Sequence, residues 1–291
     1  MNALRFSRFG WSITLLLFCA LTAHAAEDLS LKLRRQVPSG EDASKWRQQS
    51  TRDRWNPRAT AVIICDMWDR HWCQGATARV AAMAPRMNDL LKELRHRGVL
   101  IIHCPSDTMS FYQEHPGRKL ARSAPKVELP AKPGGWCALN KDKEPDLPIE
   151  VIHDGCDDLP PCQPPKNGHY PWTRQIATLE IEPGDVITDN VEAIYLLKQR
   201  GITNVLILGV HVNMCVLGRP FGIRQLVYQG FKVALVRDLT DAMYCSRGRP
   251  YVNHFTGNDL VIGHIEQYWC STVTSDQIIG GKPYRFPKDV R

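Results

Sequence analysis

The sequence predicts an α/β protein with a mostly parallel sheet and helices on both faces, in three layers. Short apolar runs alternate with segments whose apolar residues recur at helical spacing, and this alternation is typical of a parallel sheet. The runs are apolar almost throughout, as expected for strands that are buried on both faces. The four runs are TAVIICD (60–66), VLIIHC (99–104), NVLILG (204–209) and KVALVRD (232–238).

Three segments between these runs have helical patterns. The first, 77–98, ends at Gly98, and the second, 189–204, has Asp189 as a predicted cap and Gly201 as a stop. The third helical pattern covers 218–230 and follows the run that ends in LILG after a short connecting segment that contains Cys215. Cys215 therefore lies where a predicted strand runs into a predicted helix.

The first 25 residues have the pattern of a secretory signal peptide. Arg5 and Arg8 precede an apolar run, and AHA (23–25) is a small-x-small cleavage site. We therefore expect an exported protein, periplasmic or secreted. Residues 26–58 are polar and basic and are expected to form a mobile or surface-draped N-terminal arm, followed by one domain over 59–291.

A long segment, 105–173, interrupts the alternation of strands and helices. It is rich in Pro, Gly, Cys and charged residues, and its length indicates a functional insertion. Nine cysteines follow the leader, so an oxidising compartment would pair most of them and leave at least one thiol over. Cys156 and Cys162 are the predicted local disulfide, whereas Cys65 is expected to be a buried thiol.

The charge distribution excludes some partners. The formal net charge is +7, but no run of Lys and Arg interleaved with aromatic residues forms a nucleic-acid motif. We expect a small-molecule substrate, no nucleic acid, and no membrane association once the leader is removed.

Chemistry-bearing residues lie at the ends of the predicted strands. Asp66, His103 and Cys215 are at or just beyond carboxyl ends, where ligands bind in such sheets. The ordered set VIICDMW, a second strand–helix pair and LILGVHVNMCV resembles the isochorismatase-like cysteine hydrolases, a family that includes nicotinamidases and related amidases. The resemblance covers roughly 60–244, and it implies an isochorismatase-like hydrolase domain over 59–291.

The resemblance also implies catalytic roles. Cys215 would be the nucleophile that forms a thioester with a small amide or related C–N substrate, and Asp66 the base that takes its proton. A helix N-terminus would lower the pKa of the thiol. The family's lysine is absent, and Arg174 is the residue expected to replace it. Backbone amides of His211 and Cys215 would hold the oxyanion, with a cis bond between Val210 and His211.

Several other residues are expected around the substrate. No metal is expected, because His103, Asp107 and His115 lack the spacing of the nicotinamidase ligands, and no cofactor is expected. By analogy with the family we expect a homo-oligomer. The predicted substrate-lining residues are Trp68, His103, Tyr112, Trp172, His211 and Asn213.

Each assignment has a structural alternative. Cys215 could be half of a disulfide or a buried thiol, Asp66 a strand-end carboxylate, and Arg174 part of a surface ion pair. Arg219 and Arg224 are interpreted as structural or interface residues. Two other functions remain open: a hydrolase of the same fold that works without covalent catalysis, and a catalytically inactive small-ligand-binding protein.

Overall fold

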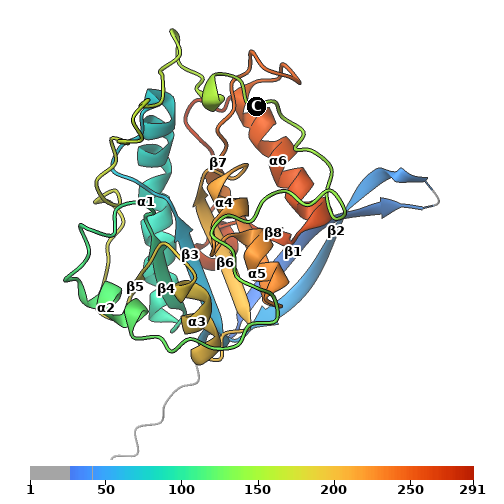
Figure 1. Ribbon diagram of the computed structural model, residues 1–291. Coiled ribbons are helices and arrows are strands. Elements are labelled where there is room, and N and C mark those ends of the chain that lie inside the picture. The colour runs from blue at the N-terminus through green and yellow to red at the C-terminus, as the bar shows by residue number, and fades with distance from the viewer. Residues whose placement is uncertain (1–26, 41) are drawn as a thin grey trace, which may run out of the picture.

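A computed structural model describes residues 27–40 and 42–291, so the predicted leader over 1–25 lies outside the described residues. An eight-stranded sheet crosses the molecule in the order β2-β1-β8-β7-β6-β3-β4-β5 (Figure 1). Its strands are β1 (Leu29–Ser39), β2 (Asp42–Trp55), β3 (Thr60–Cys65), β4 (Leu100–Cys104), β5 (Val186–Ile187), β6 (Asn204–Val210), β7 (Lys232–Asp241) and β8 (Ser271–Val273).

Six of these strands, β3 to β8, run parallel to one another, which confirms the predicted mostly parallel sheet. Helices lie on both faces of it. The helices are α1 (Gln74–His96), α2 (Pro116–Arg122), α3 (Glu192–Gln199), α4 (Cys215–Gly218), α5 (Ile223–Tyr228), α6 (His254–Tyr268) and α7 (Asp276–Ile279), with short 3-10 turns at η1 (Pro57–Ala59) and η2 (His153–Gly155).

The sheet has a core on each face, which explains the uninterrupted apolar runs. Successive side chains of a strand point to opposite faces. In β3, Ala61 and Ile63 pack with α3, α5 and α6, whereas Val62 and Ile64 pack with α1 and α7. All four are fully buried, so a polar residue at any of them would lose its contact with water.

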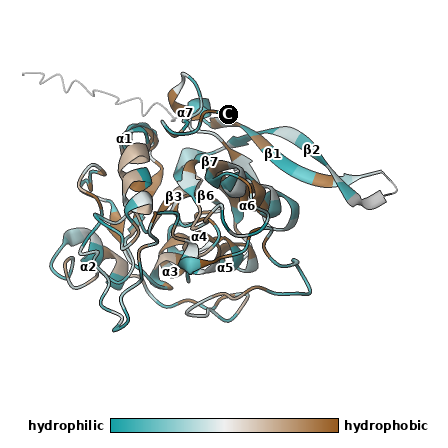
Figure 2. Cartoon of the chain, turned by 90° about the horizontal axis from the view of Figure 1, so that it is seen from above, coloured by the Kyte–Doolittle hydropathy of each residue, from teal (hydrophilic) through white to brown (hydrophobic). Residues whose placement is uncertain are grey.

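The segment expected to be a surface-draped arm is a β-hairpin instead. β1 and β2 pair antiparallel, and β1 meets β8 at Arg34 and Thr272. Leu29, Leu31 and Trp55 are buried in the same core as α1. The far end of the hairpin projects beyond the body of the molecule, as both views show (Figures 1 and 2). The alternating Leu residues of β1 thus extend the sheet.

A close approach of two strands positions the end of β6. Gly209 has a φ of +104°, and a Cβ added there would lie 2.1 Å from the backbone oxygen of Cys65. Only glycine fits this position. It brings the carboxyl end of β6 against the carboxyl end of β3, the strand that Asp66 follows.

The 105–173 segment contains little regular structure. α2 and η2 are its helical elements, and the rest follows an irregular path between β4 and β5. It is nevertheless held in place, because the backbone N–H of Cys137 donates to the Gly218 carbonyl at 2.6 Å and Glu144 reaches into the core. Among the described residues no helix has both the length and the apolarity to cross a bilayer.

Candidate active site

Asp66 and Cys215 meet where β3 and β6 end. Asp66 follows β3 directly, and Cys215 is the first residue of α4, a few residues after β6. The carboxylate of Asp66 is fully buried and lies beside the partly exposed Cys215 thiol, so that each group shifts the pKa of the other. It also accepts the backbone N–H of Ser106 at 2.8 Å. A buried carboxylate therefore lies against a thiol at the predicted ligand-binding edge.

Arg219 supplies the positive charge beside this pair. Its Nε lies 3.2 Å from Oδ2 of Asp66, and its Nη2 lies 3.1 Å from Oδ2 of Asp107. Burial alone would lower the pKa of Arg219, but Asp66, Cys215 and Asp107 raise it, so the guanidinium stays charged. The site thus consists of a thiol, a carboxylate and an arginine that follows Cys215 by four residues.

Burial controls the proton between the two reactive groups. It raises the pKa of the Asp66 carboxyl above its ordinary 3.8, although Arg219 opposes the shift. Burial and the charge of Asp66 also raise the pKa of the Cys215 thiol. The sequence pattern predicted a lowered pKa for this thiol, whereas burial and the charge of Asp66 raise it. Both shifts disfavour the charged forms of the two groups.

The structure places Arg174 away from this pair. Its side chain is exposed, and its guanidinium lies over the Phe111 ring at 5.4 Å from the centroid. The positive charge that lies against Asp66 is that of Arg219, which the sequence pattern had indicated as a structural or interface residue. The reason is local, because the predicted 218–230 helix is interrupted after Gly218. Arg219 has an extended backbone conformation there, and its side chain contacts Asp66.

The backbone around Cys215 has the geometry that the resemblance implied. The peptide bond between Val210 and His211 is cis. A backbone hydrogen bond from His211 reaches the Cys215 sulfur and favours the thiolate. An N–H group at this position could stabilise negative charge that develops beside the sulfur.

Aromatic rings form a continuous stack beside the site. Trp68, two residues after Asp66, is buried and stacks on Trp172 with ring centroids 4.2 Å apart. Trp172 stacks in turn on the half-exposed Tyr170, also at 4.2 Å. We call Trp68, Trp172 and Tyr170 the aromatic stack. Because both faces of Trp172 are covered by other rings, the exposed part of the stack available to a ligand is Tyr170.

Two histidines, His71 and His211, connect the aromatic stack to the segment that precedes Cys215. His71 lies 5.4 Å from Trp172 and 5.1 Å, edge to face, from His211. Burial lowers the pKa of His71 to about 4 and that of His211 well below its ordinary value, so both rings are neutral at neutral pH. Within the part of the chain that the structure describes, Nε2 of His211 is buried without a hydrogen-bond partner.

Three of the predicted lining residues are held inside the protein instead. His103 is fully buried, with Nδ1 at 2.9 Å from Gln175 and Nε2 at 3.2 Å from Asp185. Asn213 exchanges two hydrogen bonds with the Met243 backbone. Tyr112 is buried, and its hydroxyl accepts the backbone N–H of Gln175 at 2.9 Å. The fold itself supplies hydrogen-bond partners to the polar groups of all three residues.

The predicted Cys156–Cys162 disulfide is absent from the described structure, in which all nine cysteines are free thiols. Both sulfurs instead lie against the Asp158 carboxylate, at 3.4 and 3.2 Å. Cys65 is a fully buried thiol, as expected.

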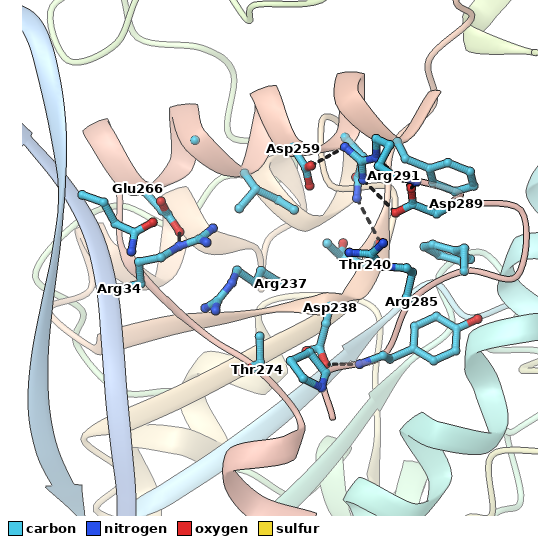
Figure 3. A pocket seen from close by; sticks show the side chains of 18 of the residues that line it. Arg34, Arg237, Asp238, Thr240, Asp259, Glu266, Thr274, Arg285, Asp289 and Arg291 are labelled. Carbon is cyan, nitrogen blue, oxygen red and sulfur yellow. Dashed lines mark hydrogen bonds and ion pairs between the residues drawn. The ribbon is translucent and has the colours of Figure 1, made fainter. Parts of the chain in front are cut away.

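A separate cavity of about 460 Å³ lies between α6, the hairpin and the C-terminal residues (Figure 3). Asp66 and Cys215 are not among the described residues that line it. Arg34 and Arg291 project into this region, but each is paired with carboxylates of the same wall, at 2.7 Å from Glu266 in the case of Arg34. No cysteine is among the described residues that line this cavity, so the thiol–carboxylate pair at the ends of β3 and β6 is the candidate site.

Comparisons with known proteins were made at the levels of sequence and structure. No protein-family model and no curated protein matches the chain. Solved structures do match. A cysteine hydrolase from Pseudomonas syringae pv. phaseolicola is 19% identical, with 77% of this chain and 92% of that chain covered and a TM-score of 0.48.

Two further matches are an isochorismatase from Pseudomonas putida and N-carbamoylsarcosine amidase from Thermoplasma acidophilum. The first is 13% identical over 76% of this chain and 91% of that chain, with a TM-score of 0.45. The second is 12% identical over 75% and 96%, with a TM-score of 0.40.

Sequence reasoning missed several residues of the site. The sequence did contain a signal for the position of Arg219. Pro220 disrupts a continuous helix, and it marks the place where the predicted helix is interrupted and Arg219 leaves the helical backbone. It contained none for His71 and Tyr170, because their ring contacts join segments that are far apart in the sequence.

Proposed function

We propose that this protein is an exported cysteine hydrolase that cleaves an amide or related C–N bond of a small substrate. The observation that carries the proposal is the placement of the Cys215 thiol beside the buried Asp66 carboxylate, with Arg219 paired to that carboxylate. Export rests on the leader-like residues 1–25 alone.

The proposed reaction begins when Asp66 accepts the thiol proton and Cys215 sulfur attacks the carbonyl carbon. The oxyanion that forms faces the backbone N–H groups of His211 and Cys215. Asp66 then returns its proton to the departing amine as the C–N bond breaks, which leaves a thioester on Cys215. A water molecule, deprotonated by Asp66, hydrolyses the thioester and restores the thiol.

Arg219 takes the place that the resemblance gave to a lysine. Its fixed charge stabilises the carboxylate when the proton is on sulfur and the thiolate when the proton has moved. A guanidinium stays protonated, so it acts by charge and leaves the proton transfers to Asp66.

Ammonia release from a panel of small primary amides and N-carbamoyl compounds is the first test. Cys215→Ala should abolish any hydrolysis found for the wild type, while Cys137→Ala, which removes a thiol of the 105–173 segment, should retain it. Mass spectrometry of acid-quenched reactions should detect the acyl group on the peptide that contains Cys215.

The alternatives give different results in the same experiment. Hydrolysis that survives Cys215→Ala would favour a reaction in which Asp66 acts without covalent catalysis. Ligand binding without turnover by the wild type would favour an inactive binding protein of the same fold.

A further inference from the structure

Three thiols from two parts of the chain converge on one carboxylate, and neither Asp66 nor Cys215 is among them. Cys73 immediately precedes α1, whereas Cys156 and Cys162 belong to the 105–173 segment. Their sulfurs lie 3.4, 3.4 and 3.2 Å from the same oxygen, Oδ2 of Asp158. We call Cys73, Cys156, Cys162 and Asp158 the thiol cluster.

The spacing of Cys73, Cys156 and Asp158 fits three corners of a tetrahedral metal site, and Cys162, whose sulfur lies 3.2 Å from the same Asp158 oxygen, is the fourth ligand that would close it. Zinc bonds of about 2.3 Å to sulfur and about 2.0 Å to oxygen place these atoms about 3.5 Å apart along the edges of a tetrahedron. The observed sulfur–oxygen distances are 3.2 to 3.4 Å. The ligand atoms of Cys73, Cys156 and Asp158 all lie within 4.8 Å of one another.

The surroundings support anionic ligands. The backbone N–H groups of Gln74 and Gly75 donate to the Asp158 carboxylate at 2.8 and 3.1 Å, and that of Ala76 donates to the Cys73 sulfur at 3.4 Å. Such outer-shell donors orient and stabilise metal-bound thiolates and carboxylates. The neighbouring Asp157 is paired with Arg79 at 2.7 Å, and its Oδ1 lies 3.7 Å from the Cys73 sulfur. Asp158 contacts all three sulfurs at shorter distances, so it is the carboxylate of the cluster.

The donor set selects the kind of metal. Three soft sulfurs and one carboxylate oxygen suit zinc, whereas magnesium and calcium prefer oxygen ligands alone. Cys73 and Cys156 are fully buried and Cys162 is partly exposed, so the cluster is closed on most sides. Four protein ligands leave no open position for catalysis, which is the pattern of structural zinc sites.

We propose that Cys73, Cys156, Cys162 and Asp158 bind one zinc ion that fixes the 105–173 segment to the start of α1. Binding would release the thiol protons and hold the three sulfurs as thiolates. The sequence pattern predicted no metal, because it considered only the nicotinamidase spacing. This site goes beyond the proposed hydrolase activity and does not depend on it.

The test uses the whole chain after the leader, purified with reductant and titrated with ZnCl₂ or CoCl₂. Wild-type protein should bind one zinc per chain by elemental analysis, and cobalt should give the absorption of thiolate-to-cobalt charge transfer. Cys162→Ser should weaken zinc binding by roughly tenfold or more. Cys137→Ser, which replaces another partly exposed cysteine of the same segment, should bind zinc as the wild type does.

A second variant guards against misfolding. Asp158→Asn keeps the shape of the side chain and one oxygen for the α1 amides, but removes the charge. It should fold, as judged by circular dichroism, while zinc raises its melting temperature less than that of the wild type.

Three results would overturn the proposal: wild-type protein that takes up no zinc, Cys162→Ser protein that binds it undiminished, or a Cys156–Cys162 disulfide in protein isolated with its metal content intact. None of them bears on the hydrolase proposal, because Cys215 is outside the cluster.

Discussion

Arg219 links two carboxylates to the reactive sulfur, so a single side chain controls the charge of the whole site. It pairs with Asp66 and Asp107, and it opposes the rise in the pKa of Cys215. The same role was expected of Arg174, whose guanidinium lies over Phe111 instead. The two arginines therefore form a matched pair for mutagenesis.

We expect Arg219→Met to lower kcat/KM about 100-fold, the typical loss when one stabilising group is removed from a charged transition state. Alkylation of Cys215 by iodoacetamide should also slow, because the thiol pKa rises without the guanidinium. Arg174→Met should leave both rates close to those of the wild type. Equal losses in the two variants would return the catalytic role to Arg174.

The acid limb of the pH profile should report Asp66. Burial raises the pKa of its carboxyl above 3.8, and the protonated carboxyl cannot accept the thiol proton. Activity should therefore fall as the pH falls through this raised pKa, at a higher pH than for an exposed aspartate. In Arg219→Met the limb should move to still higher pH, because the opposing charge is gone. A limb unmoved by this substitution would contradict the assignment of Asp66 as the base.

At the scale of elements, Glu144 holds the 105–173 segment to two helices. Its buried carboxylate accepts hydrogen bonds from Arg224 at 2.6 Å, His264 at 2.7 Å and Trp269 at 2.7 Å. Burial alone would raise the pKa of Glu144, but these three donors lower it to about 2. The ionised form is therefore favoured by folding.

We expect Glu144→Gln to lower the free energy of unfolding by about 3 kcal/mol at neutral pH, since it breaks a buried charge network. The contribution of Glu144 is fully present above the ordinary pKa of 4.5 and is lost as the pH falls toward about 2. The difference between wild type and variant should therefore shrink across that window in urea unfolding experiments.

Glu150→Gln is the control for that substitution. Glu150 lies in the same segment but is largely exposed, 3.8 Å from Arg249, and exposed pairs contribute about 1 kcal/mol or less. A Glu144→Gln variant as stable as Glu150→Gln at pH 7 would show that the network does not anchor the segment.

Strands that are buried on both faces could be predicted from the sequence, whereas the hairpin strand β1 and the very short strands β5 and β8 could not. The run over 60–66 became β3, which ends one residue earlier, and 204–209 became β6 with one residue more, because the positions inside both runs are apolar. β1 was missed because its buried leucines alternate with polar residues in a basic stretch. β5 and β8 span two and three residues and are defined by their neighbours rather than by their own composition.

The candidate site divides in the same way. Asp66 and Cys215 could be placed from the strand ends, because parallel strands bring their carboxyl ends to one edge. The position of Arg219 depends on the interruption of the helix after α4, and the position of Asp158 depends on its contacts with α1. Such contacts are set by tertiary packing, which local patterns do not encode.

At the scale of the whole molecule, the hairpin is part of the core and not an appendage. Trp55 is almost fully buried at the end of β2, in the cluster that contains Leu31 and the inner side of α1. Trp46, nearer the projecting end of the same strand, is partly exposed and makes an edge-to-face contact with Tyr268 at 5.5 Å. The two tryptophans therefore distinguish the two halves of the hairpin.

We expect Trp55→Ala to lower the free energy of unfolding by about 3–5 kcal/mol, through lost burial and the cavity left behind. This loss corresponds to a decrease of roughly 10 °C in melting temperature for a domain of this size. Trp46→Ala should cost about 1 kcal/mol, the value of one aromatic contact. Thermal unfolding of both variants beside the wild type measures the difference. If Trp55→Ala melted at the same temperature as the wild type, the hairpin would be an independent unit docked on the sheet. A loss several times that of Trp46→Ala would mean that the folded core begins at β1, within the stretch that the sequence pattern assigned to a mobile or surface-draped arm.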